Sequence, residues 1–308
     1  MRCLITGGSG FGGAGLVQAL LSRDHEVTVV DIVAPAHADA LHEVIEHPRL
    51  NYLWKSVHDL TPGDVEGHDA LAHFAAQSDV PMSFPSPLWT VWENVVGTTR
   101  VLEAVREAGI DRFLLASSGN VFGRPLYLPI DEEHPLTPHN PYAASKASQE
   151  MLAFAYWRAY GIPVTVLRNG VVIGEGMRRE IFVFKWLYNI HRDRPIVIEG
   201  GEQTRDPCYV SDTVNAWLLA LEAPREKVAG EAFQVSRGVE YTLDEIASAC
   251  MEAAGKKVPV KREPYRPGEE GMRERFDISK AKSVLGYQPE VDLPEALEKT
   301  ASWVRTLE

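Results

Sequence analysis

Tyr142 and Lys146 stand four residues apart at the start of a predicted helix, so their side chains project from the same face. A tyrosine phenol, with a pKa of about 10, is a poor base at neutral pH. A nearby ammonium favours the phenolate and lowers that pKa, which would let Tyr142 take a proton from a substrate hydroxyl. A tyrosine and a lysine at this spacing are common on helices, so the pair indicates a catalytic site only if other segments of the chain supply matching residues.

A pair of serines, Ser117 and Ser118, lies at the C-terminal end of a predicted parallel strand. Ligands of open α/β sheets bind beyond this end of the strands. A hydroxyl there could hydrogen-bond the reacting oxygen alongside Tyr142. The sequence therefore predicts that serine, tyrosine and lysine meet at one site.

A glycine-rich turn follows the first predicted strand. Residues 6–13 read Thr-Gly-Gly-Ser-Gly-Phe-Gly-Gly, and a helix follows at once. Gly7, Gly10 and Gly13 permit a tight turn, close approach of the backbone to a pyrophosphate, and close packing of helix on strand. The helix N-terminus adds unpaired amides and the positive end of its dipole. Because strand, glycines and helix occur in the required order, the segment predicts a dinucleotide site.

Asp31 ends the second predicted strand, about twenty residues past the glycines, where a carboxylate would accept hydrogen bonds from the adenosine ribose. A carboxylate repels a 2′-phosphate, and the residues that follow supply no arginine to receive one. NAD is therefore favoured over NADP. Asp59, after the third strand, is a candidate for the adenine side, and an ordinary solvated aspartate is the alternative.

These residues must be positioned by a sheet. The first half of the chain alternates short β-type segments with amphipathic helical ones, the pattern of a parallel sheet covered on both faces. The predicted strands are residues 2–6, 26–31, 51–55, 70–74, 112–117 and 164–169. The predicted helices are residues 12–22, 88–108 and 142–160. The last helix has clear start signals, with Asn140 as N-cap and Pro141 at its first position. The fold class is α/β, a Rossmann-type doubly wound parallel sheet.

The second half is less regular. Its predicted elements are helices at 181–190, from 211, at 243–254 and at 293–307, and a strand at 195–198. We interpret residues 1–170 as an NAD-binding Rossmann domain and 171–308 as a smaller C-terminal α/β lobe that binds the substrate. An apolar segment at 232–235 predicts that the chain returns to the first sheet within about 205–236.

Composition narrows the class of protein. The chain has 308 residues, 45% hydrophobic and 24% charged, which is typical of a globular enzyme-sized protein. Its net charge of −12 disfavours nonspecific binding to nucleic acid or an anionic membrane. Three scattered cysteines form neither a disulfide framework nor a zinc spacing, and the N-terminus leaves no room for a signal peptide. We expect a cytoplasmic protein with no metal and no nucleic-acid or membrane partner.

Together these residues resemble the extended short-chain dehydrogenase/reductase family, in its NAD-dependent epimerase/dehydratase branch, and within it the UDP-glucose 4-epimerase-like nucleotide-sugar epimerases. The similarity covers nearly the whole chain. Beyond the glycine loop, the matching residues are 73–77, Asn94 with 97–98, 117–123, 141–146, Arg168 with Gly174, 200–206 with 209–210 and Asp212, 266–269 and 285–287.

The resemblance implies a catalytic trio of Ser118, Tyr142 and Lys146. Ser118 is chosen over Ser117 because it stands four residues before Phe122, which fills the family's usual tyrosine place. The implied contacts to NAD are Gly7, Gly10, Phe11, Gly13, Asp31, Asp59, Ala75, Tyr142 and Lys146. The implied contacts to a nucleotide-diphosphate sugar are Ser118, Asn120, Asn169, Arg205 and Arg266. The two arginines match positions that contact the diphosphate, and guanidinium–phosphate pairs suit an acidic protein that binds an anion.

The chain departs from the family at two places. The family's Arg-x-x-Asn would place an asparagine at Val171, whereas Asn169 lies two positions earlier. The loop at 177–180, Met-Arg-Arg-Glu, is short and basic, which would shift contacts with the diphosphate.

The family runs several reactions from one opening step, oxidation at the sugar C4. Hexose 4,6-dehydratases carry an acidic residue within two positions after the catalytic Ser or Thr, and this chain has Gly119 and Asn120 there. This disfavours dehydration and also the decarboxylases that keep a glutamate there. The preferred reaction is 4-epimerisation, with UDP-hexose as the substrate, a transient 4-keto intermediate and Tyr142 as base.

Two other classes of function are weighed against it. A nucleotide-sugar 4-ketoreductase or dehydrogenase would consume cofactor, and ketoreductases of this kind often use NADP, which Asp31 disfavours. A non-catalytic dinucleotide-binding sensor would be expected to lose the Tyr142–Lys146 pair. By analogy with relatives that pair through helices such as 88–108 and 142–160, we expect a homodimer.

Overall fold

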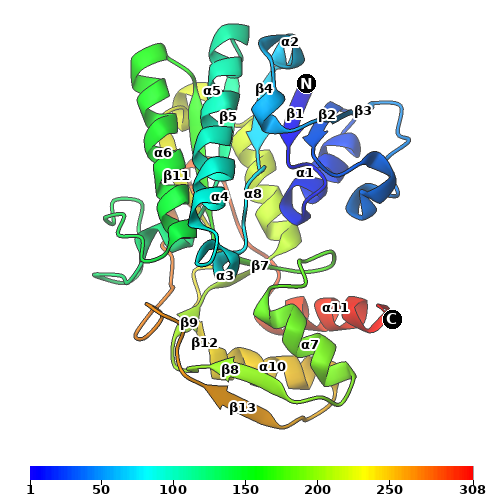
Figure 1. The fold of residues 1–308 in the computed structure, drawn as a ribbon, viewed down its shortest axis with the longest axis vertical. Coiled ribbons are helices and arrows are strands. Elements are labelled where there is room, and N and C mark those ends of the chain that lie inside the picture. Colours follow the sequence, from blue (N-terminus) through cyan, green and yellow to red (C-terminus); the bar gives the residue numbers. More distant parts are fainter. Residues whose placement is uncertain (308) are drawn as a thin grey trace.

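The computed structural model describes residues 1–307, and its centre is a seven-stranded parallel sheet in the order β11-β6-β5-β4-β1-β2-β3 (Figure 1). The strands are β1 (Arg2–Thr6), β2 (Glu26–Asp31), β3 (Leu50–Trp54), β4 (Ala70–His73), β5 (Arg112–Ser118), β6 (Val164–Asn169) and β11 (Glu231–Val235). The predicted α/β, Rossmann-type fold class is confirmed. The outermost strand β11 pairs with β6 and comes from the second half of the chain.

Alternate residues of each central strand enter opposite cores, because successive side chains of a strand point to opposite faces. In β1, Cys3 and Ile5 belong to one core and Leu4 to the other. Both faces are therefore apolar, which requires helices on each side of the sheet.

Two pairs of helices supply that cover (Figure 1). They are α1 (Phe11–Leu21) and α8 (Val210–Glu222) on one face, and α5 (Gly97–Ala108) and α6 (Pro141–Tyr160) on the other. Helix α6 begins as predicted, since the Asn140 side chain accepts a hydrogen bond from the Ala143 amide at 2.8 Å and Pro141 takes the first helical position.

The predicted helix at 88–108 is not one regular helix. It is built from α4 (Pro87–Val91), a π-helical turn (Trp92–Val96) and α5. Asn94 is fully buried within the turn. Its side chain accepts a hydrogen bond from the Gln77 amide at 2.7 Å and donates one to the Gln77 carbonyl at 2.9 Å. Such turns are frequent at functional sites, and this one fixes the loop that follows β4.

The second lobe lies below the sheet in Figure 1 and has its own hydrophobic core. Its helices are α7 (Phe182–His191), α10 (Leu243–Ala254) and α11 (Leu293–Arg305). Its short strands are β7 (Val171–Ile173), β8 (Ile196–Glu199), β9 (Thr204–Arg205), β10 (Pro207–Tyr209), β12 (Tyr241–Thr242) and β13 (Val260–Glu263). Because α8 and β11 lie between these elements in sequence yet pack with the sheet, the division at residue 170 stays a prediction.

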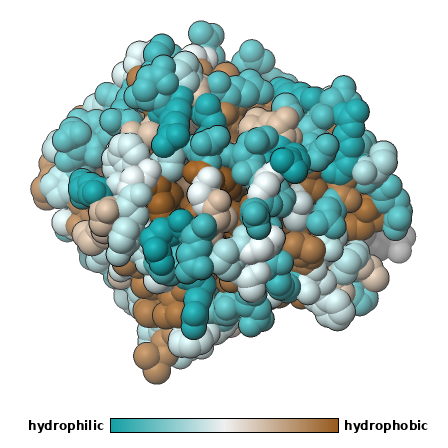
Figure 2. All heavy atoms as spheres, turned by 90° about the horizontal axis from the view of Figure 1, so that it is seen from above, coloured by the Kyte–Doolittle hydropathy of each residue, from teal (hydrophilic) through white to brown (hydrophobic). Residues whose placement is uncertain are grey.

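Three short helices, α2 (Pro62–Val65), α3 (Val80–Ser83) and α9 (Arg225–Val228), complete the connections. The face seen from above is mostly hydrophilic, with hydrophobic residues in separate small areas (Figure 2). Among residues 1–307, no helix has the length and apolar character needed to cross a membrane, and no group of side chains is suited to hold a metal ion.

Candidate active site

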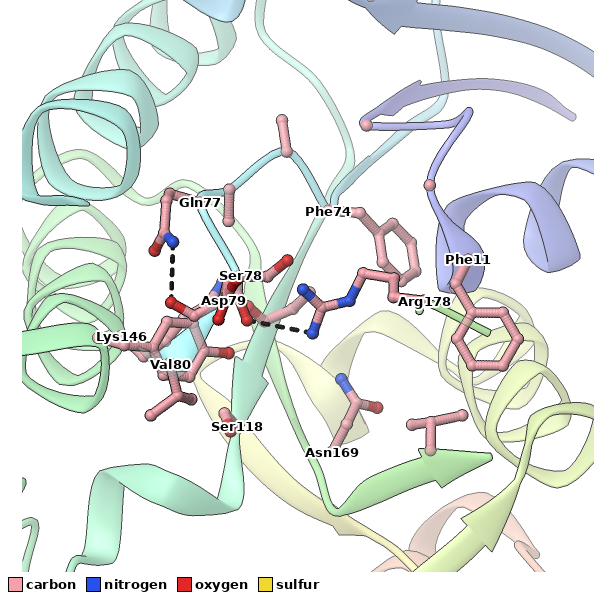
Figure 3. A pocket seen from close by; sticks show the side chains of 18 of the residues that line it. Phe11, Phe74, Gln77, Ser78, Asp79, Val80, Ser118, Lys146, Asn169 and Arg178 are labelled. Atoms are coloured by element: carbon pink, nitrogen blue, oxygen red, sulfur yellow. Dashed lines mark hydrogen bonds between the residues drawn. The ribbon is translucent and has the colours of Figure 1, made fainter. Parts of the chain in front are cut away.

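One cavity of about 880 Å³ runs along the carboxyl ends of the central strands and reaches the second lobe. It is lined by every residue that the sequence assigns to the site except Asp59: Gly7, Gly10, Phe11, Gly13, Asp31, Ala75, Ser118, Asn120, Tyr142, Lys146, Asn169, Arg205 and Arg266. The predicted meeting of serine, tyrosine and lysine with the glycine loop is therefore found in the structure, and Figure 3 shows the centre of this cavity.

The glycine loop presents open amides to the cavity. Gly7 adopts a φ of +70°, and a Cβ there would lie 2.6 Å from the backbone nitrogen of Ala75. Helix α1 has Gly10 as its N-cap and no side-chain cap, and its first internal bond runs from the Ala14 amide to the Gly10 carbonyl. The amides of the preceding helical turn thus have no intrahelical acceptor. This arrangement fits the pyrophosphate of a dinucleotide.

Asp31 is held by the backbone. One carboxylate oxygen accepts the Ser9 amide at 2.9 Å and the other accepts the Val33 amide at 3.0 Å. Each oxygen keeps a lone pair for a further donor. The carboxylate is therefore positioned to receive ribose hydroxyls.

Asp59 does not reach the cavity. It ends a 3-10 turn (Val57–Asp59) that directs its side chain to solvent, and the lining residues of this segment are Lys55, Ser56 and Val57. The assignment of Asp59 to the adenine side is not supported. The sequence places Asp59 after a strand, but it does not indicate in which direction the 3-10 turn orients the Asp59 side chain.

Tyr142 is buried against Ser118 at the end of β5. Burial raises the pKa of the Tyr142 phenol, while a hydrogen bond with Ser118 and the positive charge of Arg178 act to lower it. The Ser117 hydroxyl is engaged elsewhere, since it donates to the carboxylate of Glu150. The geometry thus favours Ser118 over Ser117 as the hydroxyl that serves the reacting oxygen.

Lys146 is buried one helical turn from Tyr142, and burial lowers the pKa of its ammonium to about 8. Its Nζ donates a hydrogen bond to the Ala116 carbonyl at 2.9 Å. The expectation from the sequence was that this ammonium lowers the pKa of the phenol. In the structure Arg178 is a further cation that acts on Tyr142, and the Lys146 ammonium is anchored to strand β5 through the Ala116 carbonyl.

Arg178 is a site residue that the sequence did not assign. It belongs to the short basic loop between β7 and α7, and Figure 3 shows its side chain crossing the cavity. Its guanidinium donates to the Ser78 carbonyl at 3.1 Å. The basic composition of residues 177–180 was the available signal, but nothing local indicates which of its two arginines points inward.

Buried polar residues behind the site act as braces. His73 bonds the hydroxyls of Thr6 at 2.6 Å and Thr98 at 2.9 Å, and burial lowers its pKa to about 3, so it is neutral. Glu150 pairs with Arg168 at 2.8 Å, and both side chains are buried. The Glu150–Arg168 pair ties α6, which carries Tyr142, to β6, and the His73 bonds join β4 to β1 and α5.

The arginines of the substrate half are already paired with carboxylates. Arg205 contacts Glu269 at 3.1 Å and Glu274 at 3.6 Å. Arg266 makes a close ion pair with Glu199. Burial raises the pKa of the Glu274 carboxyl, which also lines the cavity. The sequence did not anticipate these acidic partners, because they come together only when the loop at 264–274 folds over β8 and β9.

Neither of the two residues after Ser118 is acidic. A Cβ at Gly119 would lie 2.2 Å from the ring of Phe276. The Asn120 side-chain amide donates to the Ser118 hydroxyl at 3.1 Å. Asn169 also lines the cavity, and its amide donates to the Ser117 carbonyl at 3.2 Å.

Known proteins share this architecture. A family model described as GDP-mannose 4,6 dehydratase matches residues 4–300. A dTDP-glucose 4,6-dehydratase from an Actinoplanes species is 35% identical, covering 99% of this chain and 98% of its own. A UDP-glucose 4-epimerase from Mycolicibacterium smegmatis is 32% identical, covering 99% of this chain and 99% of its own. A crystal structure of a UDP-glucuronic acid 4-epimerase from Bacillus cereus, with UDP-glucuronic acid and NAD, has a TM-score of 0.94, 26% identity and full coverage of both chains.

Proposed function

Because this chain belongs to the NAD-dependent epimerase/dehydratase family of the short-chain dehydrogenase/reductase type, we propose that it is a nucleotide-sugar 4-epimerase that uses NAD and acts on a UDP-hexose. The observation that carries the choice of reaction is the surrounding of Ser118. A side chain at the next position would collide with the ring of Phe276, and the residue after it carries an amide. The site therefore has a base and a hydroxyl for oxidation at C4, but no carboxyl group in this segment to remove water.

Side chains of the protein transfer the proton of the C4 hydroxyl. When bound, NAD supplies the acceptor and donor of the hydride at C4. Tyr142 accepts the proton of the C4 hydroxyl and later returns it, while Ser118 hydrogen-bonds the same oxygen. The charges of Lys146 and Arg178 favour the phenolate in a site that is largely shielded from water. Since proton and hydride both return to the sugar, the product has the mass of the substrate.

The substrate half would hold the diphosphate by exchange of partners. Arg205 and Arg266 each give up a carboxylate contact when phosphate oxygens arrive, because one guanidinium can serve either anion. Asn120 and Asn169 line the same cavity as these arginines and Tyr142, and we propose that they contact the sugar and its phosphate.

Arg178 supports a second candidate, a 4-epimerase of an acidic UDP-sugar such as UDP-glucuronic acid. Its guanidinium reaches the centre of the cavity and bonds a main-chain carbonyl rather than a carboxylate. A sugar carboxylate would be a stronger partner for this cation than the carbonyl is. The Bacillus cereus epimerase, solved with UDP-glucuronic acid, is a relative with that substrate.

The test is a panel of nucleotide sugars that includes UDP-glucose and UDP-glucuronic acid, followed by mass spectrometry and proton NMR. A product of unchanged mass with an altered C4 proton coupling, formed without net NADH, supports the epimerase. Loss of water or of carbon dioxide identifies a dehydratase or decarboxylase. Net change in NADH identifies a reductase or dehydrogenase, and binding of NAD without turnover of any sugar favours the sensor.

We also propose a homodimer formed through the helices near α4 and α6. Leu88 is 85% exposed, Trp92 55% and Met151 63%, and such apolar side chains are typical of buried interfaces. Light scattering after size-exclusion chromatography tests the dimer, and Leu88→Glu should shift it toward the monomer. A cytoplasmic location is proposed from the three cysteines, which are free and buried.

A further inference from the structure

The far end of the cavity, beyond Asp31, is lined by residues from three separate segments. Ile32 and Val33 follow β2, residues 55–57 follow β3, and Glu93 comes from the π-helical turn before α5. The adenosine ribose is expected at Asp31, so the base attached to it must extend into this end. Adenine presents an amino group, a hydrogen-bond donor, together with ring nitrogens that are acceptors.

Two carboxylates near this end are unavailable to the base. Asp59 faces solvent outside the cavity. Asp64 pairs with Lys55 at 2.8 Å and caps its own helical turn through Thr61. Glu93 is the carboxylate beyond Asp31 that lines the cavity at this end.

Glu93 is held in position from both sides. Its Oε2 lies 3.4 Å from Nε2 of His58, whose ring stacks on Trp92 at a centroid distance of 5.2 Å. The next residue, Asn94, locks the π-helical turn to the backbone of Gln77. A carboxylate fixed in this way presents its other oxygen as an acceptor in a defined place.

We propose that Glu93 recognises the adenine of NAD by accepting a hydrogen bond from its exocyclic amino group, with His58 orienting the carboxylate. Glu93 would thereby fill the role that the sequence suggested for Asp59. This inference goes beyond the proposed reaction, because any chemistry that uses NAD in this cavity would place adenine here.

The test compares NAD with nicotinamide hypoxanthine dinucleotide, which carries an oxygen in place of the amino group. The native carboxylate should repel that oxygen, and a bond to a charged group accounts for about tenfold or more in affinity. Glu93→Gln should remove the preference, because a glutamine amide can accept from the amino group and donate to the oxygen. Dissociation constants from calorimetry on protein freed of dinucleotide provide the readout.

Asp59→Asn is the matched control, and it should keep the native preference for NAD. The proposal is overturned if Glu93→Gln discriminates between the two dinucleotides as strongly as the native protein does. It is also overturned if the native protein binds both equally. Because binding is measured without a sugar, failure of the epimerase proposal would leave the outcome unchanged.

Discussion

The two ends of the active-site cavity hold their ligand-binding groups in opposite states. On the sheet side, the first turn of α1 has uncapped amides, and Asp31 is fixed by two backbone donors. On the side of the second lobe, Arg205 and Arg266 are neutralised by carboxylates of the chain itself. The cofactor half is therefore preformed, whereas under the proposed function the substrate half would exchange internal ion pairs for phosphate. This difference suits a protein that keeps its cofactor and releases its product in every cycle.

Tyr142→Phe changes the residue proposed as the base, where the cofactor and substrate halves of the cavity meet, and it should have the largest effect on turnover. Loss of the proton acceptor is expected to lower turnover by about 10²- to 10⁴-fold. Binding of NAD and of UDP should remain close to native, because the glycine loop, Asp31 and the two arginines of the second lobe are unchanged. Steady-state kinetics and calorimetry measure the two quantities. Tyr160→Phe, at an exposed position of the same helix, is the control, and a Tyr142→Phe protein with native turnover would contradict the mechanism.

Arg205→Met tests whether the substrate half is held by its own ion pairs. It leaves the buried Glu274 without its counter-charge, so the free energy of unfolding should fall by up to about 3–5 kcal/mol. Adding Glu274→Gln should restore most of that stability but leave UDP binding weak. Urea unfolding and calorimetry separate the two effects. A single variant as stable as the native protein would show that these pairs contribute little.

Gly13→Ala tests the preformed half. A Cβ at this position would lie 2.3 Å from the Gly7 carbonyl oxygen, so the loop must shift, at a cost of about 1–3 kcal/mol. NAD affinity should fall about tenfold for each 1.4 kcal/mol of strain that is not relieved. Gly12→Ala is the matched control, since its nearest neighbour is the edge of the Phe74 ring at 3.2 Å. Equal NAD affinity in the two variants would argue against a rigid loop.

Arg178→Gln should have the smallest effect, on the pH dependence of turnover. Arg178 lowers the pKa of both Tyr142 and Lys146, so its loss should raise both values. The acidic limb, set by deprotonation of Tyr142 in the enzyme with NAD bound, should therefore move to higher pH. Profiles of kcat/KM against pH measure this shift. Arg179→Gln, at an exposed position of the same loop, should leave the acidic limb in place.

The elements nearest the chemistry were the most predictable. Strands β1, β2 and β6 begin and end where the sequence predicts, since short apolar segments bounded by turn residues have few alternatives. Helix α6 begins at its predicted cap for the same local reason. The helix predicted at 88–108 was partly wrong, because its π-helical turn is associated with a contact between Asn94 and the distant Gln77, which no local pattern records.

The sequence by itself determined the fold class, the glycine loop and the spacing of Tyr142 and Lys146, because these depend on local backbone geometry and on the two periodicities of strand and helix. Only the tertiary structure decided which side chains face the cavity. In the structure Asp59 lies outside the cavity, whereas Glu93 and Arg178 line it. Arg205 forms an ion pair with Glu274. The physical reason is that the direction of a loop side chain and the partner of a buried charge are set by contacts between segments far apart in the chain. Burial and charge in those contacts then fix the protonation of the groups that react.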